Sequence, residues 1–378
     1  MIRTIGFPGR YLQGPGAVQH LPELLKEFSL ATPIVLMDDL VRASVGNLLL
    51  QPLSAAGIQT TRLRFAGECT SEAIEQLALE AEQTQADVVI GYGGGKTIDA
   101  AKGIAKAHNL RLFIVPTIAS NDSPTSRLIV LYDDQHRVTR VDRLTRNPDV
   151  VLVDTAIIAR APARFFAAGL GDALSKKFEA TQCHLARGKN FFGTESLATA
   201  RLLAEHCYET IIEFGLPALK RIQEHRTPDE SVERAVEASV LLSGLGFESG
   251  GLSLSHALTR GFSAHPVMST FLHGETVAFG SIVQLIAEER PQAEVQAHID
   301  FCHSLGLPIT LAQLGAKNAT EAEIIQMATL TAAAPYIGNL TPAADANRIA
   351  QCINRADALG HATARSSVML TQTDIKTQ

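Results

Sequence analysis

Three residues in the second half of the chain have side chains suited to holding a metal ion, namely Asp172, His256 and His273. One carboxylate and two imidazoles are good oxygen and nitrogen ligands for Zn²⁺ or Fe²⁺, and three protein ligands leave a coordination position for a substrate. The chain contains 12 histidines, so many other combinations have a similar spacing. The spacing alone makes this set a candidate metal site and no more.

A glycine-rich segment in the first half is suited to binding a phosphate. Residues 91–97 read Gly-Tyr-Gly-Gly-Gly-Lys-Thr, between an apolar run and a helical pattern. Glycines allow backbone N–H groups and a helix N-terminus to approach a phosphate. The segment is not a Walker A loop, because Ile90 stands where a glycine is required, and it is not G-x-G-x-x-G, because Lys96 stands at the last position. It predicts a phosphate-binding turn of another type; a tight turn without a ligand is the alternative.

A second polar segment, residues 116–126, follows the next predicted strand and is dense in hydroxyl and amide groups. Open α/β sheets bind ligands at the carboxyl ends of their strands, and such groups suit ribose, pyrophosphate and carboxamide contacts. Asp38, at the end of the first predicted strand, is placed to accept hydrogen bonds from an adenosine ribose. A role for Asp38 in a turn or a helix cap is the alternative.

The elements that must position these residues differ between the two halves. Up to about residue 155, short apolar runs alternate with amphipathic stretches, as in a βαβ series. We expect strands at 33–37, 61–65, 86–91, 112–115 and 150–154, helices near 41–56, 71–84 and 97–108, and a hairpin of 128–132 and 137–141 laid on the main sheet, with its turn at 133–136.

Beyond residue 160 the strand pattern stops, and a 3.6-residue period runs through stretches such as 199–214, 232–245 and 275–289. This pattern predicts a helical bundle. We therefore expect an α/β nucleotide-binding domain over residues 1–160 and an all-α domain over residues 161–378 that carries the metal and the substrate. A cleft between two such domains is the default place for a ligand.

Composition excludes several other classes of protein. The net charge of −6 and the absence of a Lys/Arg cluster argue against nucleic acid and membrane partners. The N-terminus lacks the pattern of a signal peptide, and no apolar stretch approaches the ~18–20 residues that span a bilayer, so we expect a cytoplasmic protein. Five scattered cysteines without a C-x-x-C spacing indicate core residues, not disulfides or a thiolate zinc site.

The ordered series of motifs resembles the glycerol dehydrogenase group of the iron-containing, or type III, alcohol dehydrogenases. The resemblance covers nearly the whole chain, through segments 8–14, 91–97, 116–126, 247–252, 273–280 and 306–311. It implies a Rossmann-like N-terminal domain and an all-α C-terminal domain, the architecture also found in dehydroquinate-synthase-like enzymes. It further implies a small polyol substrate and a homo-oligomer, commonly an octamer.

The resemblance also implies roles for particular residues. It assigns the metal to Asp172, His256 and His273, with zinc the usual ion and iron possible, and it places Asp122 beside the substrate hydroxyls. The implied NAD contacts are Asp38, Gly94, Gly95, Lys96, Asp99, Thr117, Ser120, Ser126, Leu128 and Tyr132. In such a site, metal coordination lowers the pKa of a substrate hydroxyl and favours the alkoxide, whose carbon gives hydride to the nicotinamide.

Two departures from the family pattern open an alternative substrate class. Thr125 and Arg127 stand where small residues are common, and Thr259-Arg260 replaces a His-Asn pair. Because guanidinium groups bind carboxylates and phosphates in a bidentate manner, two additional arginines fit a hydroxy acid or a phosphorylated polyol. The other interpretation is that both arginines point to solvent or pair with carboxylates such as Asp134.

Two further functions remain possible at this stage. A dehydroquinate-synthase-like cyclase also uses NAD and a metal, but it needs many basic residues for its phosphorylated acid substrate. Lys176 and Lys177 are too few to meet this need. A non-catalytic protein that keeps the fold is the third possibility. The complete set of candidate metal ligands and Lys96 argue against it.

Overall fold

The computed structural model of the chain describes residues 2–133 and 137–376, with side chains described up to residue 366. Within these residues the chain packs as two compact units. The sheet unit comprises Gly6–Gly169 and Pro217–Leu245, and the helical unit comprises the residues up to Ile5, Leu170–Leu216 and the residues from Gly246 onward. Residues 217–245 thus return to the sheet unit, and the functional division at residue 160 stays a prediction.

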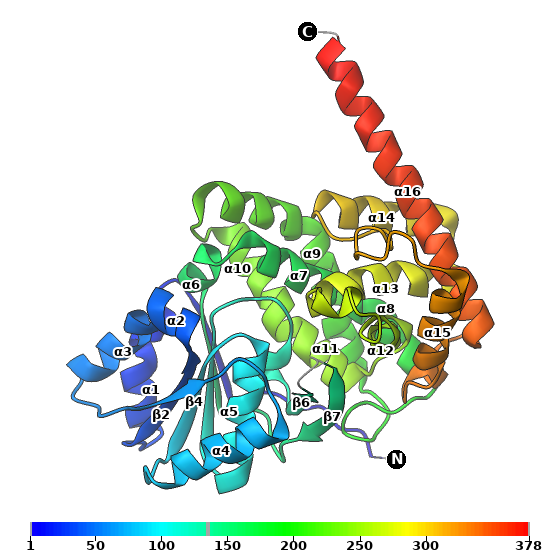
Figure 1. Cartoon of the computed structure of the whole chain (residues 1–378). Coiled ribbons are helices and arrows are strands. Elements are labelled where there is room, and N and C mark those ends of the chain that lie inside the picture. Colours follow the sequence, from blue (N-terminus) through cyan, green and yellow to red (C-terminus); the bar gives the residue numbers. More distant parts are fainter. Residues whose placement is uncertain (1, 134–136, 377–378) are drawn as a thin grey trace. The chain divides into compact units, whose positions relative to one another are not determined.

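The sheet unit is built on a parallel sheet of six strands in the order β1-β8-β5-β4-β2-β3. These strands are β1 (Arg10–Gly14), β2 (Pro33–Asp38), β3 (Thr61–Phe65), β4 (Val88–Gly93), β5 (Arg111–Pro116) and β8 (Val150–Asp154). Two of these strands, β2 and β4, are labelled in Figure 1. The five strands expected from the sequence are all present. The order and the alternation with helices confirm the predicted Rossmann-like α/β class.

Helices cover both faces of this sheet. The helices within or beside it are η1 (Ala17–His20), α1 (Leu21–Glu27), α2 (Asp39–Ser44), α3 (Gly46–Ala55), α4 (Ser71–Glu82), α5 (Gly95–His108), η2 (Ser123–Thr125) and α6 (Thr155–Arg160). Side chains of α1 and α3 share one buried apolar cluster with alternate residues of the central strands, such as Val35 and Ile90. The opposite face packs on α5, since a Cβ at Gly91 would lie 2.8 Å from that of Ala101. The alternation explains why the central strands are apolar on both sides.

Strand β1 is the one sheet element that the sequence pattern did not predict. It pairs in parallel with β8 at the edge of the sheet, and all five of its residues are only partly buried. The segment has neither a continuous apolar run nor a clear alternation, and those are the signals by which strands are predicted. Its position at the edge explains the weak signal.

The predicted hairpin forms a separate two-stranded antiparallel sheet of β6 (Leu128–Tyr132) and β7 (Val138–Arg143). It is therefore not part of the main sheet's hydrogen-bonded ladder. The turn residues 134–136 of this prediction lie outside the described residues.

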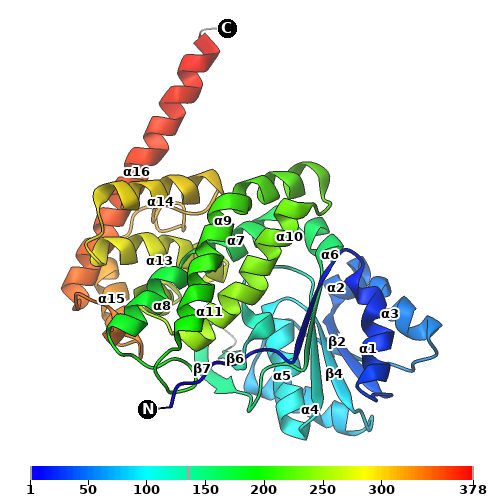
Figure 2. The same ribbon diagram turned by 180° about the vertical axis from the view of Figure 1, so that it is seen from behind.

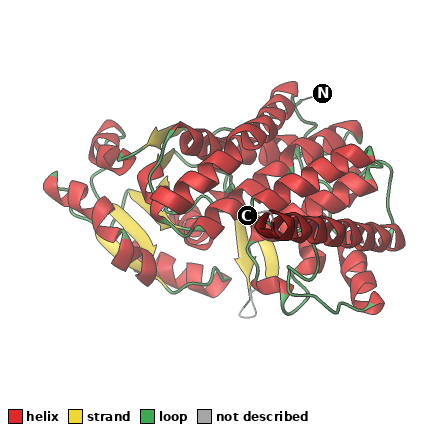
Figure 3. Cartoon of the chain, turned by 90° about the horizontal axis from the view of Figure 1, so that it is seen from above, coloured by secondary structure: helices red, strands yellow, loops and turns green. Residues whose placement is uncertain are grey.

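All regular elements described after β8 are helical. They are α7 (Ala163–Leu174), α8 (Lys176–Leu185), α9 (Ala198–His225), α10 (Glu230–Val236), the π-helix η3 (Glu237–Leu242), α11 (Ser243–Gly250), α12 (Leu254–Phe262), η4 (Met268–Thr270), α13 (His273–Ala287), α14 (Gln292–Ser304), α15 (Glu321–Ala332), η5 (Ile337–Asn339) and α16 (Ala346–Lys376). Figure 2 labels most of these helices between α7 and α16, and Figure 3 colours the helices of the whole chain red and the strands yellow. The predicted all-α second half is confirmed. None of the described helices combines the length and the apolar character needed to cross a bilayer.

Candidate functional site

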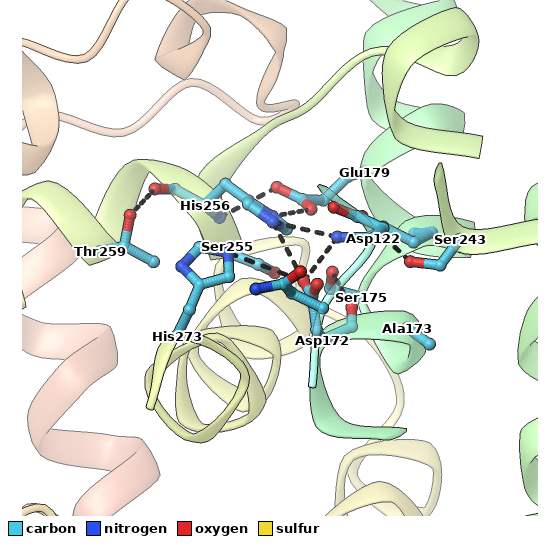
Figure 4. A network of polar contacts seen from close by, with 12 residues as sticks. Asp122, Asp172, Ala173, Ser175, Glu179, Ser243, Ser255, His256, Thr259 and His273 are labelled. Atoms are coloured by element: carbon cyan, nitrogen blue, oxygen red, sulfur yellow. Dashed lines mark hydrogen bonds and ion pairs between the residues drawn. The ribbon is translucent and has the colours of Figure 1, made fainter. Parts of the chain in front are cut away.

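The helical unit brings together the three candidate metal ligands. Asp172 lies near the end of α7, His256 lies in the first turn of α12, and His273 is the first residue of α13. Oδ1 of Asp172 is 3.3 Å from Nε2 of His256 and 3.8 Å from Nε2 of His273, and one donor atom from each residue lies within 4.8 Å of the others. Figure 4 shows the three side chains converging. His256 and His273 lie 84 and 101 positions further along the chain than Asp172, and the fold brings them next to it.

The glycine before Asp172 is required for this convergence. A Cβ at position 171 would lie 2.7 Å from the carbonyl oxygen of Gly274, a distance that real side chains do not tolerate. The absence of a side chain at Gly171 therefore lets α7 approach the first turn of α13, which carries His273. The close approach of these two helices thus explains why residue 171 of the Gly-Leu-Gly-Asp segment is a glycine.

A buried carboxylate, Glu179 on α8, fixes the orientation of His256. Its Oε2 atom is 2.5 Å from Nδ1 of His256, and its Oε1 atom accepts hydrogen bonds from the backbone N–H groups of Ser253 (2.9 Å) and His256 (3.0 Å). Glu179 therefore satisfies the N-terminus of α12 and leaves Nε2 of His256 directed at Asp172. Histidines that bind metals commonly donate their second ring N–H to such a carboxylate.

The carboxylate of Asp172 suits a cation. Burial by itself raises the pKa of Asp172, but Lys176 and the two imidazoles hold that pKa well below its usual value, so the carboxylate is ionised. Its Oδ2 atom is buried and has no hydrogen-bond partner among the described residues. A buried acceptor without a partner is costly unless something binds it. The donor set and this unsatisfied oxygen both fit a divalent ion.

The two imidazoles differ in their protonation. Burial lowers the pKa of His256, but the carboxylate of Glu179 opposes it, and the net pKa is about 9. Desolvation lowers the pKa of His273 below its usual range, although 43 % of that side chain is exposed. His273 is therefore neutral at pH 7, whereas a metal ion has to displace a proton from His256.

Lys176 is an additional cation in the same site. Its Nζ atom lies 2.6 Å from Oδ1 of Asp172 and 3.0 Å from Nε2 of His256, and its side chain is fully buried. The ring of Phe247 lies under the ammonium, with its centre 5.6 Å from Nζ. In the sequence, Lys176 was recognised only as one of two adjacent basic residues.

In the sheet unit, the glycine-rich turn joins β4 to α5 as the sequence predicts. Gly94 is the N-cap of α5 and Gly95 is its first residue. A Cβ on Gly95 would meet the side chain of Asn121 at 2.8 Å, so this turn packs against the polar loop that follows β5. Lys96 forms an ion pair with Glu68 at 2.7 Å and lies 5.0 Å from the ring centre of Tyr132. These residues lie together at the carboxyl ends of the strands, where a nucleotide is expected.

Asp38 and Asp99, both expected to contact NAD, have structural partners. Oδ1 of Asp38 accepts the backbone N–H of Val41 at 2.8 Å and so caps α2, which was the alternative interpretation. Asp99 is buried and accepts hydrogen bonds from Lys102 (3.0 Å) and Ser123 (2.8 Å). These contacts do not exclude a ligand, but each carboxylate already stabilises the local backbone or loop.

The other expected NAD contacts also lie in the sheet unit. Lys102 is fully buried and donates to the carbonyl of Leu128 (2.7 Å) and to Ser126 Oγ (3.4 Å), which ties β6 to α5. Thr117 donates its backbone N–H to Gly93 at 3.0 Å, and Ser120 in the same loop is buried. Thr117, Ser120 and Ser126 thus lie in the loop after β5 and Leu128 begins β6, and their contact with NAD stays a prediction.

Asp122 is held by a serine that the sequence analysis missed. Ser243, the first residue of α11, donates its hydroxyl to Oδ2 of Asp122 at 3.1 Å. Beside it, Thr125 donates to the backbone carbonyl of Val240 at 3.2 Å, within the π-helix η3. The wider turn of a π-helix often occurs at functional sites. Both contacts lie within the sheet unit and fix the loop that carries Asp122.

The two arginines of the anion hypothesis have different surroundings. Arg260 is exposed, and its guanidinium donates to the carbonyl of Ala333 at 3.3 Å. Arg127 is partly buried, and its carbonyl accepts the N–H of Leu144 at 2.9 Å. Asp134, the suggested carboxylate partner, lies outside the described residues.

Lys176 and Glu179 were not predicted as part of the site, although the sequence carried a signal for both. Asp172, Lys176 and Glu179 are spaced i, i+4 and i+7, which places three side chains on one face of a helical segment. Three charged residues on one face of a helical segment therefore indicated a polar network. Ser243 had no such signal, because its contact with Asp122 joins residues 121 positions apart.

Comparison with known proteins agrees with this fold. Residues 8–155 match the family model described as iron-containing alcohol dehydrogenase. The chain is 43 % identical over 329 residues to a glycerol dehydrogenase of Thermotoga maritima, covering 87 % of this chain and 89 % of that protein. It is 38 % identical over 361 residues to a glycerol dehydrogenase of Citrobacter freundii, covering 95 % and 98 % respectively.

Solved structures give the same result. The crystal structure of glycerol dehydrogenase from Schizosaccharomyces pombe superimposes with a TM-score of 0.92 at 33 % identity, covering 97 % of this chain and 93 % of that one. The chain is an iron-containing alcohol dehydrogenase by family. Within that family it belongs to the glycerol dehydrogenase group, which confirms the resemblance seen in the sequence.

Proposed function

We propose that the protein is an NAD-dependent, metal-dependent dehydrogenase that oxidises a small polyol, glycerol or a related vicinal diol, to the hydroxyketone. The observation that carries this proposal is the convergence of Asp172, His256 and His273 in the helical unit, with a buried carboxylate oxygen left unsatisfied. The similarity to glycerol dehydrogenases over most of the chain favours a neutral polyol over an anionic substrate or a cyclase reaction. Zinc is the proposed ion, with iron as the alternative.

The chain's own residues divide the work. Asp172, His256 and His273 would hold the ion, and Glu179 orients the His256 ring toward it. A divalent ion bound there lowers the pKa of an alcohol hydroxyl, so that the carbon releases hydride more readily. Lys96 and the first turn of α5 would bind the pyrophosphate of NAD, because helix N–H groups and an ammonium both attract anions.

Asp122 has a separate role in this proposal. Its carboxylate, held by Ser243, accepts a hydrogen bond from the hydroxyl next to the one that is oxidised. Such a contact selects diols over simple alcohols, since a buried acceptor left without a donor penalises the wrong substrate. The remaining expected NAD contacts, the octameric assembly and the cytoplasmic location stay predictions from the sequence.

An NAD⁺-reduction assay tests the proposal. The purified protein is assayed with glycerol, propanediols, butanediols, 2-hydroxy acids and phosphorylated polyols, with and without a chelator, and Zn²⁺ or Fe²⁺ is then added back separately. We expect NADH formation with diols, loss of activity with the chelator and recovery with one of the two ions. Net NADH production from a simple diol excludes the cyclase. Activity confined to anionic substrates, or unaffected by thorough metal removal, contradicts the proposal.

Variants of the ligands complete the test. Asp172→Asn and His273→Ala should each lose bound metal, measured by metal analysis of the purified protein, together with activity. His184→Ala is the matched control, because His184 lies on the neighbouring helix α8 and outside the cluster. Retention of stoichiometric metal by both ligand variants would place the ion elsewhere.

A further inference from the structure

The ammonium group of Lys176 contacts two of the atoms that would bind the proposed ion. Nζ is 2.6 Å from Oδ1 of Asp172 and 3.0 Å from Nε2 of His256, and these two atoms are 3.3 Å apart. The lysine side chain has no exposed surface, so solvent does not hold the ammonium. A buried monovalent cation thus shares two of the three candidate ligand atoms.

Electrostatic repulsion prevents the Lys176 ammonium from staying next to Asp172 and His256 while these residues bind a metal ion. An ion about 2.1 Å from both atoms would lie no more than about 3.6 Å from Nζ, as the three distances above require. A divalent and a monovalent cation at that separation repel strongly, because the side chains of Lys176 and Asp172 are buried and solvent screens their charges little. The ammonium must therefore leave Asp172 and His256 when a metal ion binds.

We propose that Lys176 is a built-in competitor of the metal ion, which lowers the metal affinity of the site and stabilises the metal-free protein. This inference rests on the proposed metal site. Asp172 is buried and ionised. Removal of one partner from a buried ion pair leaves the charge of the other uncompensated. Lys176 supplies the compensating charge in the absence of an ion, so the protein exchanges its metal without losing the fold of the helical unit.

Zinc affinity measured by competition with a chromophoric chelator tests the proposal directly. Lys176→Met keeps much of the side-chain length and removes the charge, so it should bind Zn²⁺ at least about ten-fold more tightly than the unaltered protein. Lys177→Met is the matched control: Lys177 is adjacent, partly exposed and paired with Glu205 on the surface. Its affinity should equal that of the unaltered protein. Lys176→Arg, which keeps the charge, should not tighten binding.

Thermal unfolding gives a second readout that does not depend on activity. Without metal, Lys176→Met should unfold at a lower temperature than the unaltered protein, and saturating Zn²⁺ should raise its unfolding temperature by a larger increment. Lys176→Gln provides the same comparison if the methionine variant does not fold. A lysine that merely fills space would show the destabilisation without the gain in affinity.

The outcomes separate this inference from the metal site itself. Equal or weaker zinc binding by Lys176→Met and Lys176→Gln, with the unaltered protein still binding zinc, overturns the competitor role and leaves the proposed function intact. Absence of zinc and iron binding in all variants and in the unaltered protein overturns both.

Discussion

Nδ1 of His256 lies 2.5 Å from Oε2 of Glu179, so a residue on α8 sets the ring orientation of a residue 77 positions away on α12. The same carboxylate accepts the backbone N–H of Ser253 and of His256. Helix capping and the orientation of a metal-binding imidazole thus depend on one buried side chain. A change at Glu179 affects both the start of α12 and the direction of Nε2.

Glu179→Gln should weaken metal binding by about 10- to 100-fold, the usual effect of removing a partner of a ligand histidine. An amide can donate as well as accept, so it no longer fixes which ring nitrogen of His256 carries the proton. Chelator competition with Zn²⁺ measures the loss. Glu205→Gln, at an exposed glutamate paired with Lys177, is the control. Unchanged zinc affinity in Glu179→Gln would show that Asp172 and His273 dominate binding.

Ser243→Ala should lower kcat/KM for glycerol by about 10- to 100-fold, because a hydrogen bond to a charged group contributes about 1.5–3 kcal/mol. The hydroxyl of Ser243 holds Oδ2 of Asp122 at 3.1 Å, so its loss releases the carboxylate proposed to contact the substrate. Ser243→Thr, which keeps the hydroxyl, should recover most of the activity.

The control for this prediction is Ser239→Ala, four residues earlier. Ser239 is equally buried, but its hydroxyl donates to the backbone carbonyl of Ala235. A similar loss of activity in both alanine variants would indicate a general disturbance of the π-helix. A selective rise in KM for diols, with KM for NAD⁺ unchanged, would locate the effect at Asp122.

The sequence predicted the elements that carry strong periodic signals. The apolar run around Val89 and the glycines that follow it identify a central strand and the turn at its carboxyl end, since both features are local. The candidate ligands Asp172, His256 and His273 came from their chemistry and from the family resemblance. Their spacing in the sequence does not distinguish them from other histidines, because their proximity depends on the packing of α7, α12 and α13.

The features that could not be predicted from the sequence are those that depend on tertiary contacts. The burial of Lys176 against Asp172 depends on how the helices pack, and lysine is otherwise a residue of exposed surfaces. Strand β1 depends on pairing with β8, more than 130 residues later. The placement of residues 217–245 in the sheet unit likewise has no marker in the periodicity of α9 and α10.

The cysteines give a prediction about reactivity. None of the five forms a disulfide and all are buried, and burial raises the pKa of Cys69 and of Cys302 to about 12. Because the thiolate is the reactive form, the native protein should react slowly with a thiol reagent at pH 8 and should expose five thiols only after unfolding. Ser44→Cys, at an exposed position, should add one fast thiol. Rapid reaction of a native cysteine would contradict the packing described for it.

Gly360→Ala should destabilise the helical unit by about 2 kcal/mol or more, since overpacking against rigid groups is costly. A Cβ at this position of α16 would lie 1.8 Å from the carbonyl oxygen of Ile309, and a backbone oxygen cannot rotate away as a side chain can. Gly338→Ala is the matched control, because nothing lies within 4 Å of a Cβ there. Calorimetric unfolding should show a lower transition temperature for Gly360→Ala and a change within error for Gly338→Ala. Equal stability of the two variants would mean that α16 does not pack closely on the segment around Ile309.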